Sequence, residues 1–381
     1  MTENLKRLRT DHVSSLLRPP SLIDAFMARG GGELDEAGLV EAQDTAIREV
    51  VSRQQAAGLP VVSDGEYRRL NWQVSFSDVD GWDLWQGSWR GFLENPSTVA
   101  EGEQPGQRGR DTVESSKVPA TAKLKLRENF PLREFQFLDS VTTTATGKAM
   151  LMGPDRVAQM CDVSGSSPHY GTADDFLADV TAIQHGMVGE LIEAGCQYIQ
   201  LDEPSYTGYV DQDTLERIAA RGEDPFQNLA RAVDASNTVI DGYEGQACFG
   251  LHICRGNRAS MWHREGTYDG IAEYLFANLK FDRLLLEYDT ERAGGFEPLA
   301  YVPKGGPTVV LGLITTKDGA VEDVETLMAR IDAASKFIDL EQLAISPQCG
   351  FASGISGNFL SEDAQWRKLD VMQEVARRVW G

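Results

Sequence analysis

Short apolar runs alternate along this chain with longer amphipathic segments. The runs are roughly four to eight residues long, several are rich in β-branched residues, and most end in polar residues, glycine or proline, which is the pattern of buried strands. A first strand is expected near residues 12–17. Others are expected at residues 60–66, 148–154, 198–204, 248–254, 283–289, 308–314 and 343–349.

The segments between these strands have the periodicity of amphipathic helices. Two of them, at residues 36–58 and 172–195, end in Gly58 and Gly195, where the glycine that follows a helix is expected. Nearly continuous apolar strands separated by helices favour a parallel sheet that is buried on both faces. We therefore predict an α/β fold, a single-domain (β/α)8 TIM barrel over residues 1–381, with a doubly wound sheet as the alternative.

One segment, residues 73–147, interrupts this rhythm. It contains Trp82, Trp85 and Trp89, then a long polar stretch, then the alternating runs TAKLKLREN and REFQFLDSV. The alternation predicts a β-hairpin, and we interpret the whole segment as an insertion after the second strand. The tryptophans are expected to serve local packing, with a substrate lid as the alternative.

The charge balance argues against whole classes of partner. Lys and Arg total 36 against 58 Asp and Glu, which gives a formal net charge of −22. Such a field repels phosphate backbones and anionic membrane surfaces, so neither nucleic acid nor a membrane is an expected partner.

The N-terminal region lacks the features of a signal peptide, and the apolar stretches are too short to span a bilayer. Five cysteines do not suggest a disulfide framework, so we expect a cytoplasmic protein, with homo-oligomerisation left open.

Chemically active side chains gather at the predicted strand ends. In a parallel barrel the carboxyl ends of the strands form one mouth, where active sites are built. His252 and Cys254 are two residues apart on one strand and project to the same face, while Glu287 and Cys349 end other strands. Two thiolates, an imidazole and a carboxylate form a tetrahedral ligand set that suits Zn²⁺. On spacing alone, a structural histidine beside a buried cysteine remains the alternative.

Six motifs spread over nearly the whole chain resemble one known family. They are HVSSLLRP, SDGEYRR, IQLDEPS, LHICRGN, LEYDT and ISPQCGF. Together they resemble the catalytic barrel of cobalamin-independent methionine synthase, and most closely its short single-barrel relatives. The resemblance implies methyl transfer to the thiol of homocysteine and a zinc ion bound by His252, Cys254, Glu287 and Cys349.

The resemblance also implies a substrate site. Glu66 of DGE and Asp202 of LDEP match the carboxylates that hold the amino group of homocysteine. Ser15 matches a serine whose backbone helps to hold the amino acid.

Several positions depart from the family pattern. Ser14 stands where the family has glycine, and Gly208 stands where a carboxylate contacts the folate. The run GPDRVAQMCDVSG, which follows the third strand, has no tryptophan for stacking the pterin. Lys317 stands in the place of a proton-relaying histidine and is therefore a candidate catalytic residue. Most of these departures concern the methyl donor, so the resemblance does not point to folate as the donor.

Arginines beside the motifs are a further candidate feature. Arg18, Arg68, Arg69 and Arg255 are expected to lie near the barrel mouth, where they are candidates to bind a carboxylate or sulfonate of a substrate. A surface or ion-pair role for each arginine is the alternative.

The predicted function is a zinc-dependent thiol S-alkyltransferase, with methyl transfer to homocysteine as the main hypothesis and the zinc-bound thiolate as nucleophile. Two anionic cysteine ligands should keep that thiolate nucleophilic, which favours alkyl transfer over hydrolysis. An epoxyalkane:coenzyme M transferase, in which the thiolate of coenzyme M opens an epoxide, is the alternative with the same zinc chemistry. A non-catalytic thiol-binding barrel with structural zinc and the metal-free uroporphyrinogen decarboxylase branch of the superfamily are the others.

Overall fold

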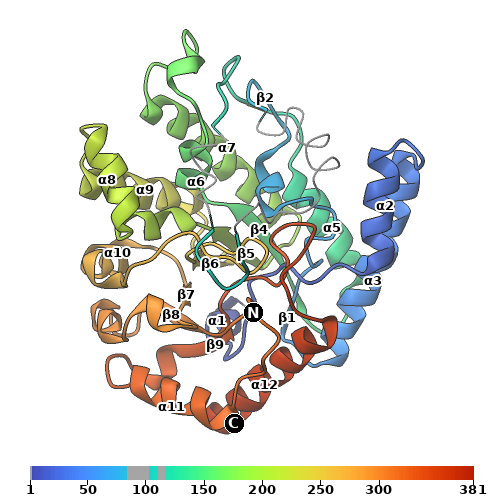
Figure 1. Cartoon of the computed structure of the whole chain (residues 1–381), viewed down its shortest axis with the longest axis vertical. Helices are drawn as coiled ribbons and strands as arrows, with labels where there is room; N and C mark the ends of the chain where they lie inside the picture. The colour runs from blue at the N-terminus through green and yellow to red at the C-terminus, as the bar shows by residue number, and fades with distance from the viewer. Residues whose placement is uncertain (1, 84–102, 110–116) are drawn as a thin grey trace.

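Parallel strands curl around the centre of the molecule and helices surround them (Figure 1). This computed structural model describes residues 2–83, 103–109 and 117–381. Within this part of the chain, seven strands pair in the order β1-β4-β5-β6-β7-β8-β9. Their bounds are β1 Val61–Val62, β4 Thr146–Met152, β5 Tyr198–Asp202, β6 Cys248–Ile253, β7 Arg283–Glu287, β8 Thr308–Ile314 and β9 Leu343–Pro347. The predicted TIM-barrel-like architecture is confirmed.

An N-terminal segment without regular strand structure occupies the eighth position, between β9 and β1. The amide of Asp11 donates to the carbonyl of Ile345 in β9 at 3.2 Å, and the hydroxyl of Ser63 donates to the carbonyl of Ser14 at 2.8 Å. The prediction of a regular strand at residues 12–17 is therefore wrong, because the pairing with β9 is an isolated bridge that lies earlier in the chain. Ser14 has φ 141°, which ends the extended path at this point.

Side chains along the strands alternate between the surrounding helices and the interior of the ring. On β6, Leu251 and Ile253 belong to the large core between sheet and helices, and His252 takes the opposite face. On β5, Ile199 and Leu201 pack outward in the same way. The interior face of these strands is consequently free to carry polar and charged side chains.

The helices begin and end at residues that the sequence marks clearly. Their bounds are α1 Thr2–Lys6, α2 Pro20–Gly30, α3 Glu36–Ala56, α5 Phe130–Val141, α6 Pro154–Gln159, α7 Ala173–Glu193, α8 Gln212–Ala220, α9 Pro225–Ile240, α10 Ala272–Asn278, α11 Val324–Ala334 and α12 Glu362–Trp380. Asp35 caps α3, and Thr172 caps α7 with a reciprocal capping box. Gly58 and Gly195 follow α3 and α7 with φ 76° and 92°, which confirms the predicted helix ends.

The predicted β-hairpin is wrong in its second half. Residues 133–141 lie in helix α5, which Asn129 caps through its side chain and in which Phe135 and Leu138 are buried at helical spacing. Only Lys125–Leu126 of the first run forms a strand, β3, which pairs with β2 (Val79–Asp80). The cap and the spacing of the buried residues outweigh the local alternation, so the interruption of the barrel ends before α5.

Trp82 has a packing role, as expected. Its ring contacts Phe176 edge-on at 5.5 Å between ring centroids, and its Nε1 donates to the carbonyl of Val118. The lid alternative for Trp85 and Trp89 falls outside the described residues.

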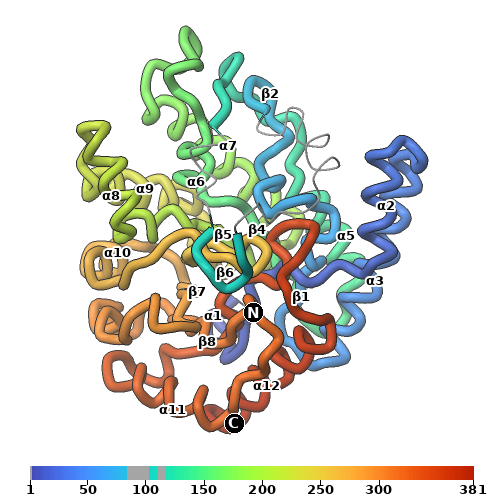
Figure 2. Tube along the Cα trace, viewed as in Figure 1, coloured from blue at the N-terminus to red at the C-terminus, as the bar shows by residue number. Residues whose placement is uncertain are grey.

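One described part of the interrupting segment crosses the barrel mouth (Figure 2). The amide of Gly106 donates to the carbonyl of Ser260 at 2.9 Å, and that of Gly109 donates to Trp262 at 2.7 Å. Arg258 pairs with Glu103 across the same contact. Residues 103–109 therefore lie against the loop that follows β6.

Buried charges tie the N-terminal segment into the interior of the barrel. Asp11 pairs with Lys148 at 2.9 Å and with Arg283 at 3.1 Å, and all three side chains are 0% exposed. Burial raises the pKa of Asp11, but the two cations outweigh it and hold the pKa at about 2.

We expect Asp11→Asn to lower the free energy of unfolding by about 3–5 kcal/mol, because two buried cations lose their counter-charge. Denaturant unfolding followed by circular dichroism measures this change. Asp363→Asn, which breaks an exposed pair with Arg367, is the control and should leave the unfolding midpoint unchanged. A similar small effect of both substitutions would contradict the prediction.

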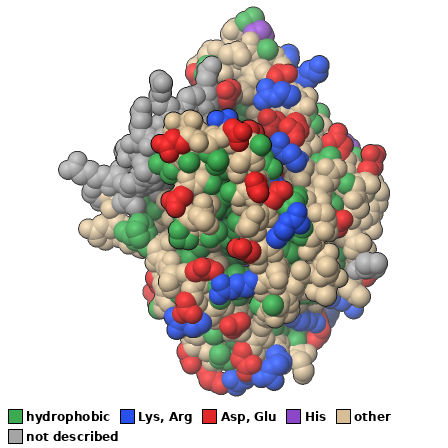
Figure 3. Space-filling view, turned by 90° about the vertical axis from the view of Figure 1, so that its right-hand side faces the viewer, with side chains coloured by type: hydrophobic (Ala, Val, Ile, Leu, Met, Phe, Trp, Pro, Cys, Tyr) green, Lys and Arg blue, Asp and Glu red, His purple; other side chains and the backbone are tan. Residues whose placement is uncertain are grey.

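One face of the molecule carries charges of both signs. On the face in Figure 3, acidic and basic side chains are interspersed around apolar ones. Among the described residues, no helix is long and apolar enough to cross a membrane.

Candidate metal centre

Three predicted ligands meet at the mouth of the barrel. His252 ends the interior face of β6, Cys254 directly follows that strand, and Cys349 lies just after β9. Their ligand atoms all lie within 4.8 Å of one another, and all three residues are buried. Among the described residues this is the one such group of histidine, cysteine and carboxylate side chains that could hold a metal ion.

The histidine ring is oriented for binding through one nitrogen. Nδ1 of His252 lies 3.3 Å from the carbonyl of Leu285 on the neighbouring strand. Nε2 is buried and has no hydrogen-bond partner. When Nδ1 carries the proton and donates to this carbonyl, the lone pair of Nε2 is left for a metal ion.

The two thiols differ in acidity. A hydrogen bond from Cys349, followed by the charge of His252, places the pKa of Cys254 well below the usual thiol value. The same hydrogen bond and burial raise the pKa of Cys349. The pair thus readily holds one thiolate. Two sulfurs and an imidazole nitrogen are the donors that zinc prefers, so these residues fit a zinc ion.

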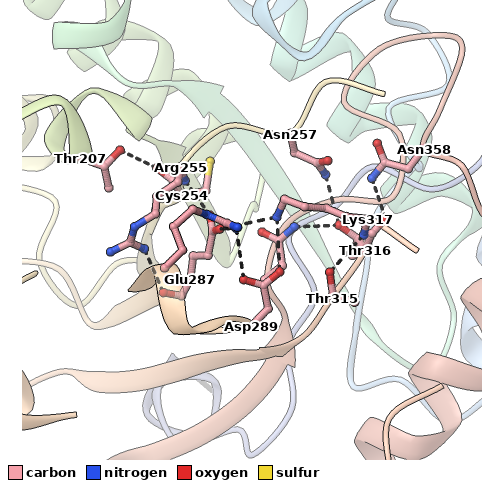
Figure 4. A network of polar contacts seen from close by, with 12 residues as sticks. Thr207, Cys254, Arg255, Asn257, Glu287, Asp289, Thr315, Thr316, Lys317 and Asn358 are labelled. Carbon is pink, nitrogen blue, oxygen red and sulfur yellow. Dashed lines mark hydrogen bonds and ion pairs between the residues drawn. The ribbon is translucent and has the colours of Figure 1, made fainter. Parts of the chain in front are cut away.

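Glu287, the fourth predicted ligand, lies beside this group rather than within it. Its carboxylate accepts from the backbone amide of Arg255 at 2.6 Å (Figure 4). It also accepts from Arg292 at 2.9 Å. Burial raises its pKa, but the charges of Lys317, Arg255 and Arg292 lower it to about 2. Glu287 is therefore a buried carboxylate that protein cations already neutralise.

Lys317 belongs to the same ion cluster. Its Nζ lies 3.4 Å from Asp289 and 3.5 Å from Glu287. Burial lowers the pKa of Lys317, but these two carboxylates outweigh it and raise the pKa. The lysine is thus held as a cation, which suits neutralisation of Glu287 better than proton relay.

Glu66 points an unsatisfied oxygen into the protein. Its Oε2 is buried without a hydrogen-bond partner. Burial raises its pKa to about 8, and the charge of Asp202 contributes to this rise against the opposing charges of Arg69 and Arg18. Its backbone has φ 60° and is held by Asp64, which accepts from its amide, and by Arg18, which donates to its carbonyl at 2.8 Å.

Asp202 and Ser15 lie at two other positions around this mouth, Asp202 at a strand end and Ser15 in the irregular N-terminal segment. Asp202 ends β5, and its register partner on β6 is His252. Ser15 accepts from the amide of Phe351 at 2.8 Å and packs so closely on Gly350 that a Cβ there would lie 1.9 Å from its hydroxyl. Ser15 therefore lies against the residue that follows Cys349.

The predicted anion-binding arginines already have partners in the protein, and Arg69 pairs with the buried Glu134 at 2.6 Å. Arg18 donates to four backbone carbonyls, including those of Glu66 and Ala352. Arg68 pairs with Asp44, and Arg255 binds the carbonyls of Gly266 and Glu287. The guanidinium groups of Arg18 and Arg255 thus hold strand-end loops in place, whereas that of Arg68 is bound to helix α3.

Sequence reasoning missed several functional groups of the site. Arg292 and Asp289 complete the ion cluster around Glu287, and Gln200 donates to Asp202 at 2.6 Å. The signal for Gln200 was present, since it lies two residues before Asp202 and shares its face of β5.

A cavity of about 460 Å³ lies outside the carboxyl ends of β4 and β5. Its wall includes Asp155 from α6 and Tyr209, which ends the 3-10 helix η4 (Pro204–Tyr209) after β5. Arg231 and Arg264 also line it, as does the apolar side chain of Ala158. The cavity therefore combines a cationic part with an apolar part.

Comparisons with known proteins identify close relatives of this chain. Residues 125–378 match the family described as the cobalamin-independent synthase catalytic domain. The Bacillus subtilis protein YxjH is 33% identical over 98% of this chain and 94% of its own length. A methionine synthase of Pyrococcus abyssi is 24% identical over 90% of this chain and 86% of its own length.

Solved structures agree with these matches. A Listeria monocytogenes protein assigned as a vitamin-B12-independent methionine synthase superposes with a TM-score of 0.75 and 28% identity, covering 98% of both chains. A B12-independent methionine synthase from Shewanella, solved with selenomethionine, has the same fold, with a TM-score of 0.69 at 19% identity, covering 98% of this chain and 97% of its own.

Proposed function

Because this chain belongs to the cobalamin-independent methionine synthase family, we propose that it transfers a methyl group to the thiol of homocysteine and forms methionine. The observation that carries the proposal is the buried group of His252, Cys254 and Cys349 at the barrel mouth.

The three residues would hold a zinc ion, with Glu287 as the nearest further carboxylate. An ion bound there supplies a lowered pKa to a coordinated substrate thiol, which then reacts as a thiolate at neutral pH. Arg292 and Lys317 would neutralise Glu287 whenever its carboxylate is not a ligand. The thiol ligands require a reducing compartment such as the cytoplasm, and all five cysteines are free.

The buried carboxyl groups favour a thiol that carries an ammonium group. Glu66 has an unpartnered oxygen, and the negative charge of Asp202 contributes to the raised pKa of Glu66. An ammonium between them would relieve this repulsion and satisfy the oxygen. Because the predicted arginines are already bound to protein groups, a sulfonate such as that of coenzyme M has weaker support. Ser15 stays a candidate for holding the amino acid backbone.

In the proposed reaction the sulfur attacks the methyl carbon while the bond between that carbon and the donor breaks. The donor leaves with the bonding electron pair. The protein's own contribution is to orient the amino acid through Glu66 and Asp202 and to keep the sulfur in a buried site.

Methyl iodide, a donor that needs no binding site, tests this reaction directly. Zinc-loaded protein should form methionine from homocysteine and methyl iodide at neutral pH much faster than metal-free protein, as measured by mass spectrometry. With coenzyme M in place of homocysteine, zinc loading should increase the rate of methylation only slightly. An equal increase in rate for both thiols would favour the coenzyme M alternative. No increase in rate for either thiol would favour a thiol-binding barrel with structural zinc.

We propose that the natural donor binds in the cavity outside β4 and β5, whose lining includes none of the three residues of the metal-binding group. Ala158→Trp fills part of this cavity, so it should raise the KM for the donor about tenfold or more while leaving the KM for homocysteine unchanged. Initial rates with each substrate varied in turn measure both values. A change confined to the homocysteine KM would contradict this placement.

A further inference from the structure

A continuous chain of polar contacts runs through the barrel interior and ends at Asp202. Arg283 and Lys148 both pair with Asp11, at 3.1 and 2.9 Å. Lys148 also donates to Oε1 of Gln200 at 2.9 Å, and Nε2 of Gln200 donates to Oδ1 of Asp202 at 2.6 Å. Lys148, Gln200 and Asp11 are almost completely buried. The chain thus connects the rigid interior of the barrel to the proposed substrate site.

Lys148 fixes which way the amide of Gln200 points. An ammonium group can only donate, so the atom that faces Lys148 must be the oxygen Oε1. Nε2 is then turned toward Asp202 and also donates to the carbonyl of Val13 at 3.1 Å. The orientation of this amide is therefore set by a charge rather than by chance packing.

Gln200 holds one oxygen of Asp202 and leaves the other available. Oδ1 accepts from Gln200, whereas Oδ2 makes no hydrogen bond to the described residues. Because Gln200 and Asp202 lie on the same face of β5, the contact is short and requires no loop to move. The carboxylate is consequently held in one rotational position at the mouth.

We propose that Gln200 and Lys148 are positioning residues for the amino group of the substrate: Lys148 orients Gln200, and Gln200 orients Asp202 to receive an ammonium. This inference rests on the proposed function and adds two residues that act through Asp202. The buried charges of Lys148, Asp11 and Arg283 would then contribute to substrate selection as well as to stability.

Gln200→Met tests the proposal, since it keeps a long unbranched side chain but removes the donor. Binding of homocysteine and of 4-mercaptobutanoate, which lacks the amino group, would be measured by calorimetry on zinc-loaded protein. We expect the Kd for homocysteine to rise about tenfold or more, with the Kd for 4-mercaptobutanoate and the zinc content unchanged. Lys148→Met should weaken homocysteine binding in the same selective manner.

Gln342→Leu is the matched control, because Gln342 is also a buried glutamine and binds the amide of Gly305 and the carbonyl of Pro303 away from the mouth. It should change neither Kd. If Gln200→Met weakened the binding of both thiols equally, or of neither, the positioning role alone would be overturned. If the wild-type protein bound the two thiols with equal Kd values, both the positioning role and the proposed function would be wrong.

If the variants do not fold, a crystal structure of the wild-type complex with homocysteine decides the question. We expect the substrate nitrogen within hydrogen-bond distance of Oδ2 of Asp202, with the contact from Gln200 to Oδ1 retained. A substrate nitrogen bound elsewhere would overturn the inference.

Discussion

Cys349→Ser should abolish stoichiometric zinc binding and lower methyl transfer by about a thousandfold or more. Loss of the second sulfur removes one of three converging donors, and a bound ion would contribute several kcal/mol of stabilisation to the reacting sulfur. Metal analysis of the purified variant and its initial rate with homocysteine measure the two effects. Cys254→Ser should behave in the same way, since both sulfurs belong to the same buried group.

Cys248→Ser is the matched control. Cys248 begins β6, is fully buried, and lies outside the group at the mouth. It should keep its zinc and most of its activity. If Cys349→Ser retained one zinc ion per chain and full activity, the proposed ligand set would be wrong.

Glu66→Gln should raise the KM for homocysteine by about ten- to a hundredfold with little change in zinc content. Its unpartnered oxygen is the most direct receptor for an ammonium, and a hydrogen bond between charged groups contributes about 1.5–3 kcal/mol. Steady-state kinetics at saturating donor measure the KM. The substitution keeps the shape of the side chain, so a large loss of stability is not expected.

An amino-free thiol separates this effect from general damage to the site. The wild-type protein should bind 4-mercaptobutanoate weakly, and Glu66→Gln should bind it as well as the wild-type protein does. Asp44→Asn, which alters a carboxylate that pairs with Arg68, serves as the control and should leave the KM unchanged. A Glu66→Gln variant with an unchanged KM would contradict the assigned role of Glu66.

The barrel could be predicted from the sequence because its strongest local signals agree with its packing. Continuous apolar runs such as TVVLGLI have every residue buried in β8, and Gly58 and Gly195 end helices where expected. The convergence of Cys349 with His252 and Cys254 also followed from one rule, that parallel strands bring their carboxyl ends to one mouth. Periodicity and topology were sufficient to predict the barrel and the meeting of these strand ends, whereas the assignment of the three side chains as zinc ligands depended on the family resemblance.

Other features depend on long-range contacts that spacing does not encode. Arg18 and Arg255 look like anion-binding residues in sequence, yet they bind carbonyls of distant loops. The ion pairs that hold Glu287 come from Arg292 and Lys317 in two different loops. The helix at residues 133–141 was missed because its cap, Asn129, lies before the run that looked like a strand.

The interior of the barrel explains how a buried polar group can be built at its mouth. Outward-facing residues such as Leu251 supply the apolar core, so the inward positions can carry charges. Asp11 and its two cations tie the N-terminal segment to the barrel interior, and that segment leads to Ser15 at the mouth. Stability and site geometry therefore depend on the same buried network.

X-ray absorption at the zinc edge, recorded on zinc-loaded protein with and without homocysteine, tests the central claim most directly. The account predicts a nitrogen and two sulfur ligands from the protein, and one additional sulfur when homocysteine is present. A zinc environment without the two cysteine sulfurs, or one that homocysteine leaves unchanged, would contradict it.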